Sequence, residues 1–141
     1  MDFRQMHQLI NNIFPLKHHF RGINFEFHPS MKKDKNGFWI YFAPKEPVGH
    51  YLCLVECRDK IYFFDPLGEA PNSYGLFIEC KFVPFRIQSE ISQNCGLFCL
   101  FFAYHALFLP NPKAVITRYF SESSFRFNEK VVKSWLVSVL S

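Results

Sequence analysis

An almost unbroken apolar stretch from Cys95 to Leu109 constrains the fold of this chain more than any other feature. It spans fifteen residues and includes Tyr104 and His105, so it is shorter than the roughly 18 residues that a membrane-crossing helix needs. Because it is hydrophobic on every side, it predicts a helix buried at the centre of a globular protein. Pro110 ends the stretch. We therefore expect no part of the chain to enter a membrane.

The composition favours one domain over residues 1–141 with a large aromatic core. Hydrophobic residues make up 49% and charged residues 20% of the chain, with 19 Phe, 6 Tyr and 2 Trp, which excludes a disordered or fibrous protein. The net charge of +4 is too mild to indicate a nucleic-acid partner by itself. Five cysteines cannot all pair, and the first residues lack a secretory signal pattern. We expect an intracellular monomer that is not secreted.

Local patterns predict an α+β fold, in which helices flank a central twisted sheet of mixed or antiparallel strands. Asp2 and Gln5 suggest a capping box for a first helix that Pro15 ends, and residues 17–35 resemble a loop. Apolar and β-branched runs predict strands at Phe38–Phe42, Tyr51–Glu56, Ile61–Phe64 and within Phe77–Ile87. Further helices are expected at Cys95–Leu109, from Asn111 and Pro112 to Phe120, and from Asn128 onward.

The polar segment Arg58–Lys60 predicts a β-hairpin that brings a histidine near a carboxylate. With the turn centred on Asp59, Asp65 pairs with Cys53, and His50 lies at the same end of the hairpin as Asp65. A histidine oriented by an acid is typical of general acid–base chemistry. The alternative is a surface histidine near a turn.

The polar residues 88–94 run directly into the apolar helix and place Cys95 in its first turn. Free N–H groups and the helix dipole stabilise a thiolate there, and a thiolate can attack a carbonyl. Gly96 leaves room for a substrate, while the Cys95 backbone N–H and the Gln88 side chain offer donors to an oxyanion. Gln93 competes for that role, but we expect it to face away. The alternative for Cys95 is a small buried hydrophobic residue.

Three segments together resemble a known family: Gly49-His50, Phe64–Gly68, and the run from Gln88 to Cys99. They are similar to the adenovirus-type cysteine proteases, the adenain family, which belong to the clan of ubiquitin-like protein proteases. Their order of His, acid, Gln and Cys differs from that of papain-like enzymes, in which Cys precedes His. The resemblance implies a nucleophile at the N-terminus of a buried central helix, with these roles: Cys95 as nucleophile, His50 as general base and then acid, Asp65 as orienting acid, and Gln88 with the Cys95 backbone as oxyanion hole.

The chain departs from this family in three respects. Tyr51 follows the histidine where members usually carry Trp, and Asp65 stands where adenoviral enzymes generally have Glu. The segments between acid and nucleophile, and after the nucleophile, are also shorter than in adenoviral proteases. Elements that bind substrate or activators are the ones we expect to be reduced.

The resemblance also implies activators, although the chemistry itself requires no cofactor. Viral members are activated by DNA and by a short peptide joined through a disulfide, for which Cys80 is the sole candidate by position. Cys53 and Cys57 point to one side of a strand without further ligands, so no metal site is expected. A basic stretch that could contact DNA comprises Lys17, Arg21, Lys32, Lys33 and Lys35.

The sequence thus predicts a cysteine endopeptidase that processes capsid or core precursor proteins of a virus or a Polinton-type mobile element. Such an enzyme would act in the host nucleus or cytoplasm, or inside the virion. Two alternatives stay open. One is a protease that removes a ubiquitin-like modifier after Gly-Gly, and the other is a catalytically inactive relative that binds proteins.

Overall fold

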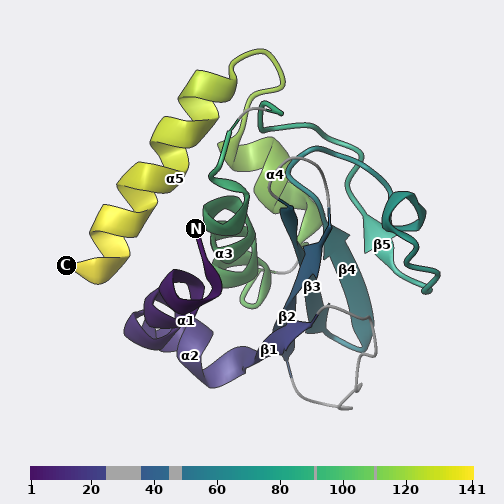
Figure 1. Cartoon of the computed structure of the whole chain (residues 1–141), viewed down its shortest axis with the longest axis horizontal. Coiled ribbons are helices and arrows are strands. Elements are labelled where there is room, and N and C mark those ends of the chain that lie inside the picture. Colours follow the sequence, from purple (N-terminus) through teal and green to yellow (C-terminus); the bar gives the residue numbers. More distant parts are fainter. Residues whose placement is uncertain (25–35, 45–48, 91, 110) are drawn as a thin grey trace.

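A five-stranded mixed sheet with helices packed on one face forms the framework of the protein in this computed structural model (Figure 1). The structure describes residues 1–24, 36–44, 49–90, 92–109 and 111–141. The strands lie in the order in which they occur in the chain: β1 (Phe20–Asn24), β2 (Gly37–Ala43), β3 (His50–Cys57), β4 (Lys60–Phe64) and β5 (Lys81–Phe82). The helices are α1 (Phe3–Asn12), α2 (Phe14–His19), α3 (Cys95–Ala106), α4 (Lys113–Tyr119) and α5 (Phe125–Leu140), with a 3₁₀ helix at Pro71–Tyr74.

The centre of the sheet is an antiparallel meander with a parallel strand at each edge. β2 pairs with β3 and β3 with β4 in antiparallel fashion, whereas β1 runs parallel to β2 and β5 parallel to β4. This arrangement confirms the expected α+β class and the mixed sheet.

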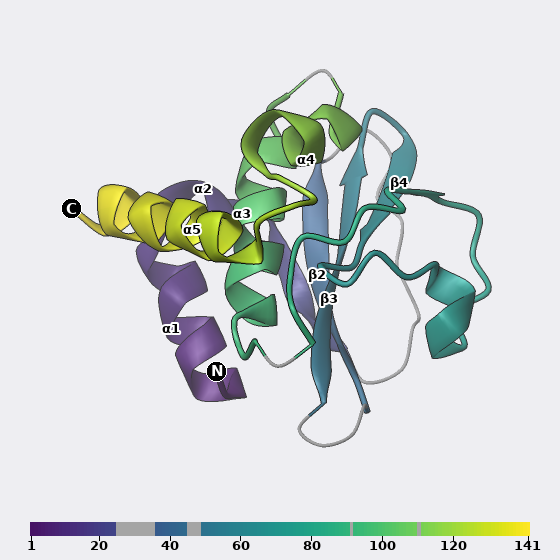
Figure 2. The same cartoon turned by 90° about the horizontal axis from the view of Figure 1, so that it is seen from above.

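Strand β3 is buried along its whole length because both faces of the sheet are covered. Side chains such as Cys53 and Val55 point into the main core beneath the helices. Leu52 and Leu54 point into a smaller core on the other face, which the segment around the 3₁₀ helix covers. Figure 2 shows α1, α2, α3 and α5 on one side of the sheet and this segment on the other.

Helix α3 occupies the centre of the main core, as its apolar composition predicts. It packs against β3, and Phe102 stacks on Phe64 of β4 at a ring-centroid distance of 4.5 Å. The helix ends at Ala106, three residues earlier than expected. Among the residues described, no helix is both long and apolar enough to cross a membrane.

Several sequence-based boundaries were wrong for local reasons. Asp2 and Gln5 do form the capping box of α1, but Pro15 lies in the first turn of α2 as well as after α1, because proline is favoured there. Residues 17–24 form the end of α2 and strand β1 instead of a loop. The last helix begins at Phe125, where the Ser124 hydroxyl accepts a hydrogen bond from the Phe127 N–H, so Asn128 lies inside it.

The register of the β3–β4 hairpin differs by one residue from the prediction. Cys53 pairs with Phe64 instead of Asp65. The reason is a two-residue turn in which Arg58 and Asp59 both have positive φ angles, 53° and 63°, as type I′ turns require. The shift moves Asp65 just beyond the end of the paired strand.

Candidate active site

Three polar side chains lie together at one edge of the fold, where β3 and α3 begin and β4 ends. His50 is the first residue of β3, Asp65 follows the last residue of β4, and Cys95 is the first residue of α3. Antiparallel neighbours place the start of one strand beside the end of the other. The N-terminus of α3 lies against the same end, so the fold brings together the three residues that the sequence singled out.

Gly49 allows the chain to turn tightly just before His50. Its φ of +79° is in the left-handed region, which glycine adopts at little cost. A Cβ atom on Gly49 would also lie only 2.2 Å from the ring of Phe42. A side chain at this position would therefore disturb both the backbone turn and the aromatic wall beside the histidine.

The Asp65 carboxylate holds His50 from a fixed position. His50 Nε2 lies 2.6 Å from Asp65 Oδ1, and both side chains are buried. The carboxylate also accepts hydrogen bonds from the Leu67 N–H at 2.9 Å, the Glu69 N–H at 3.2 Å and the Tyr74 hydroxyl at 2.5 Å. With its oxygens anchored in this way, the carboxylate can fix the imidazole by a single strong, charge-assisted bond.

The environment of Cys95 favours its thiolate. Burial raises the pKa of this thiol, but hydrogen bonds from His50 and from the backbone N–H groups of Tyr51 and Gly96 outweigh burial and lower it. Tyr51 N lies 3.5 Å from Cys95 Sγ. The position at the first turn of α3 adds the positive end of the helix dipole.

The histidine shifts in the complementary direction. Burial lowers the pKa of His50, yet its hydrogen bonds to Asp65 and Cys95 and their negative charges raise it from 6.5 to about 9. A raised histidine pKa and a lowered cysteine pKa both favour a thiolate–imidazolium pair. Such a pair is the reactive form of a cysteine nucleophile.

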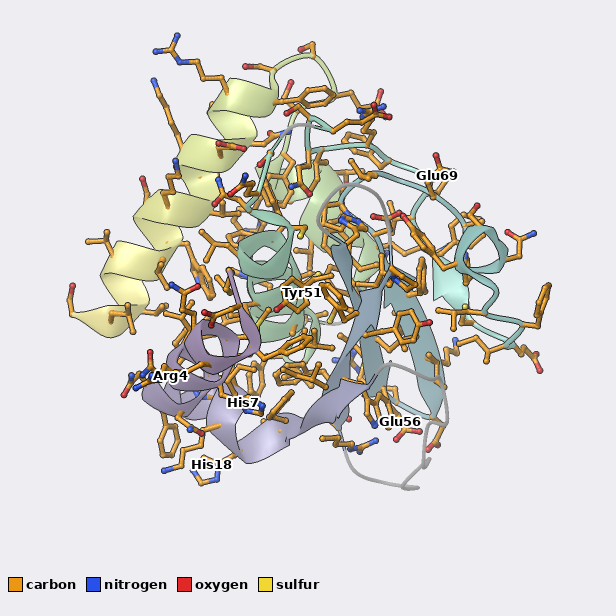
Figure 3. All side chains as sticks on the ribbon, viewed as in Figure 1. Arg4, His7, His18, Tyr51, Glu56 and Glu69 are labelled. Atoms are coloured by element: carbon orange, nitrogen blue, oxygen red, sulfur yellow. The ribbon has the colours of Figure 1, made fainter. Side chains whose placement is uncertain are left out.

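A cleft of about 750 Å³ gives access to this pair. His50 and Cys95 line it, although only 5% and 8% of their surfaces are exposed. One wall is aromatic: Phe42 contacts both Phe3 and Tyr51 with ring centroids 5.2 Å apart. Tyr51 itself lies between the sheet and α3 (Figure 3).

Gln88 lies in the same cleft and is almost fully buried. Its side-chain Nε2 donates a hydrogen bond to the Ser92 carbonyl at 3.1 Å, and this amide carries a second N–H donor. Its Oε1 is buried without a hydrogen-bond partner in the described part of the chain. Gln93, the competing oxyanion donor, also lines the cleft.

The segment that carries Gln88 is fastened to two other parts of the molecule. The backbone N–H of Gln88 donates a hydrogen bond to the carbonyl of Pro66, the residue after Asp65, at 3.2 Å. On the other side, the Asn128 side chain of α5 donates to the Ile87 carbonyl at 2.9 Å, and the Ser92 hydroxyl donates to Glu129. Gln88 is thus placed relative to both Asp65 and α5.

Neither a family model nor a curated protein matches this chain in sequence.

The sequence reasoning missed two contributors to the site. Met1, Asp2 and Phe3 line the cleft, and Tyr74 binds Asp65 from a 3₁₀ helix nine residues further along the chain. Neither follows from local patterns, although Tyr74 lies in the Pro- and Gly-rich stretch next to Asp65. The expectation that Gly96 leaves room for substrate was also wrong, because Met1, Met6 and Tyr51 already occupy that space.

The remaining candidate residues lie apart from the cleft. Cys80 packs beside the smaller core on the other face of the sheet, and Cys53 and Cys57 are buried in the main core. Within the described segments, no group of three or more His, Cys, Asp or Glu side chains is arranged to hold a metal ion.

Only part of the basic stretch lies within the described structure. Arg21 lies 2.5 Å from Glu56 and over the Trp39 ring, so it is engaged inside the fold. Lys32, Lys33 and Lys35 lie outside the described residues.

Proposed function

We propose that this chain is a cysteine endopeptidase of the adenain-like type. The observation that supports it most strongly is that the hydrogen-bonded Asp65–His50 pair and the Cys95 thiol, whose pKa His50 lowers, lie together at one cleft. The electrostatics of the pair agree, since the pKa of the thiol is lowered and that of the imidazole is raised. This combination is more specific than a buried cysteine or a surface histidine alone.

The reaction would begin with attack of the Cys95 thiolate on the carbonyl carbon of a peptide bond. The negative charge that develops on the carbonyl oxygen would be stabilised by the Cys95 backbone N–H and the second N–H of the Gln88 side chain. The His50 imidazolium would then give its proton to the leaving amine as the C–N bond breaks, which leaves a thioester on Cys95. His50, now neutral, would remove a proton from water, and the resulting hydroxide would release the carboxylic acid and regenerate the thiolate.

Precursor proteins of capsids or cores are the substrate class that the family resemblance suggests. The cleft has a volume of about 750 Å³, which lies in the range of well-formed ligand pockets, and its walls combine apolar and polar side chains. The reaction uses only side chains and backbone groups that line or adjoin the cleft.

Site-specific alkylation tests the proposed pair. Wild type, His50→Ala and Cys95→Ala are treated with iodoacetamide near pH 6, and each cysteine is quantified by peptide mass spectrometry. We expect Cys95 to react much faster than Cys80, whose pKa is raised by burial, and His50→Ala to slow Cys95 strongly. Equal rates in wild type and His50→Ala would reject the assignment.

Cleavage of a mixed peptide library tests the reaction itself. Wild type should produce new peptide ends that Cys95→Ala does not produce. A fast-reacting Cys95 without any such cleavage would point to the inactive, protein-binding alternative. Cleavage confined to Gly-Gly conjugates would instead identify a deconjugating protease.

A further inference from the structure

Two thiols on consecutive turns of α3 contact the same residue of β3. The backbone N–H of Tyr51 donates to Cys95 Sγ at 3.5 Å, and the thiol of Cys99 donates to the Tyr51 carbonyl at 3.4 Å. Residues four apart lie on one face of a helix. Cys95 and Cys99 therefore bind the N–H and the carbonyl of the same strand residue, Tyr51.

The two thiols have opposite electronic roles. Cys99 is fully buried, and burial raises its pKa well above the ordinary value, so it remains a protonated donor. Cys95 has a lowered pKa and 8% exposure, and its sulfur is the acceptor. Because Cys99 is uncharged, its removal takes the hydrogen-bond donor from the Tyr51 carbonyl without removing a charge beside Cys95.

The strand needs such a partner at this point. β3 extends beyond β4, since the register between the two strands ends at Cys53 and Phe64. Tyr51 is only 3% exposed, and buried backbone groups must find hydrogen-bond partners. The Cys99 thiol provides one for the carbonyl. This holds the Tyr51–Leu52 peptide against α3, directly after the peptide whose N–H meets Cys95.

We propose that Cys99 is a positioning residue, which holds the Tyr51 backbone so that its N–H is directed at Cys95 and His50 stays in place. This inference rests on the proposed function of Cys95 as the nucleophile. Cys99 itself does not meet the substrate, because it lies one turn below Cys95 in the core. It acts on the stability of the thiolate through the strand.

The test compares variants that keep or lose the donor. Cys99→Ala and Cys99→Val both lose it, whereas Cys99→Ser keeps a hydroxyl. Cys53→Ala is the matched control, because it removes another fully buried thiol from β3 in the same core. For each variant, the iodoacetamide rate at Cys95 is measured against pH by peptide mass spectrometry, and thermal unfolding verifies the fold.

We expect Cys99→Ala and Cys99→Val to move the alkylation midpoint of Cys95 to higher pH and to slow labelling near pH 6 by roughly two- to tenfold, the usual worth of one hydrogen bond. Cys99→Ser and Cys53→Ala should retain the wild-type midpoint. Val is closer to Cys in size, so the alkylation midpoint of Cys99→Val provides the test if Cys99→Ala does not fold.

Two results would overturn the inference: a wild-type midpoint in a folded variant without the donor, or an equal shift in Cys53→Ala. These results are separable from the failure of the proposed function. A midpoint that depends on Cys99 without any peptide cleavage would reject the protease and retain the positioning role. Cleavage by wild type with a midpoint insensitive to Cys99 would do the reverse.

Discussion

Replacing Asp65 by Asn tests whether its carboxylate keeps His50 protonated beside Cys95. The carboxylate accepts hydrogen bonds from His50 Nε2, the Leu67 N–H, the Glu69 N–H and the Tyr74 hydroxyl. An amide has the same shape but only one acceptor oxygen. Hydrogen-bond donors approach both oxygens of Asp65, so the NH₂ group of Asn would face a donor in either orientation. The substitution therefore removes the negative charge and leaves the histidine poorly held.

The size of the effect follows from the pKa of His50. Burial lowers this pKa, but Asp65 and then Cys95 raise it from 6.5 to about 9, which corresponds to about 3 kcal/mol in favour of the imidazolium. Asp65 is the strongest of the groups that raise it. Its loss should therefore remove about half of this free energy or more, and the thiolate–imidazolium population should fall roughly 10- to 100-fold.

The assay is the pH dependence of Cys95 alkylation between about pH 4 and pH 9. The midpoint for Asp65→Asn should lie about one to two pH units above that of wild type. Asp59→Asn, in the hairpin turn with a positive φ that Asn also adopts, is the control and should not move it. An unchanged midpoint in folded Asp65→Asn would refute the idea that this carboxylate sustains the pair.

Three further outcomes follow from the structure. Gln88→Ala should slow peptide cleavage by roughly 100-fold and leave Cys95 alkylation unchanged, because only cleavage passes through an oxyanion; steady-state kinetics and labelling of one preparation compare the two. Burial lowers the pKa of His105 below its ordinary value of 6.5, so the unfolded chain binds a proton there more readily than the folded protein. The free energy of unfolding should therefore keep its full value above pH 6.5 and decrease as the pH falls below it. His105→Phe should reduce the difference in thermal midpoint between about pH 7.5 and pH 5, and an undiminished difference would contradict the sign. Asn128→Ala loses buried hydrogen bonds to Ile87 and Ser121 and should lower the free energy of unfolding by about 2–3 kcal/mol, measured by urea titration.

The features that local patterns could predict are those decided by neighbouring residues. Asp2 and Gln5 are three apart and form their capping box within one turn of α1. The apolar run beginning at Cys95 is hydrophobic on all sides, and only a buried helix accommodates it. The grouping of His50 with Asp65 also followed from a single hairpin, since sequence neighbours pair in antiparallel strands.

The features that were missed depend on contacts between distant segments or on one backbone angle. The hairpin register depended on Arg58 and Asp59 both adopting positive φ. Asp does so more often than most residues, but Arg does not, so the two-residue turn could not be predicted from the sequence. Strand β1 contains a glycine and an arginine, and its parallel partner β2 determines that it is a strand. Tyr74 reaches Asp65 only because the segment after β4 folds back over the sheet.

The residues that line the cleft come from distant parts of the chain. Cys95 lies at the end of the core helix, whereas Met1 and Phe3 belong to the beginning of the chain and still border the opening. Anything fused directly ahead of Met1 would consequently emerge at the rim of the cleft that Cys95 lines. A tag for the labelling experiments is therefore better placed after α5, none of whose residues lines the cleft.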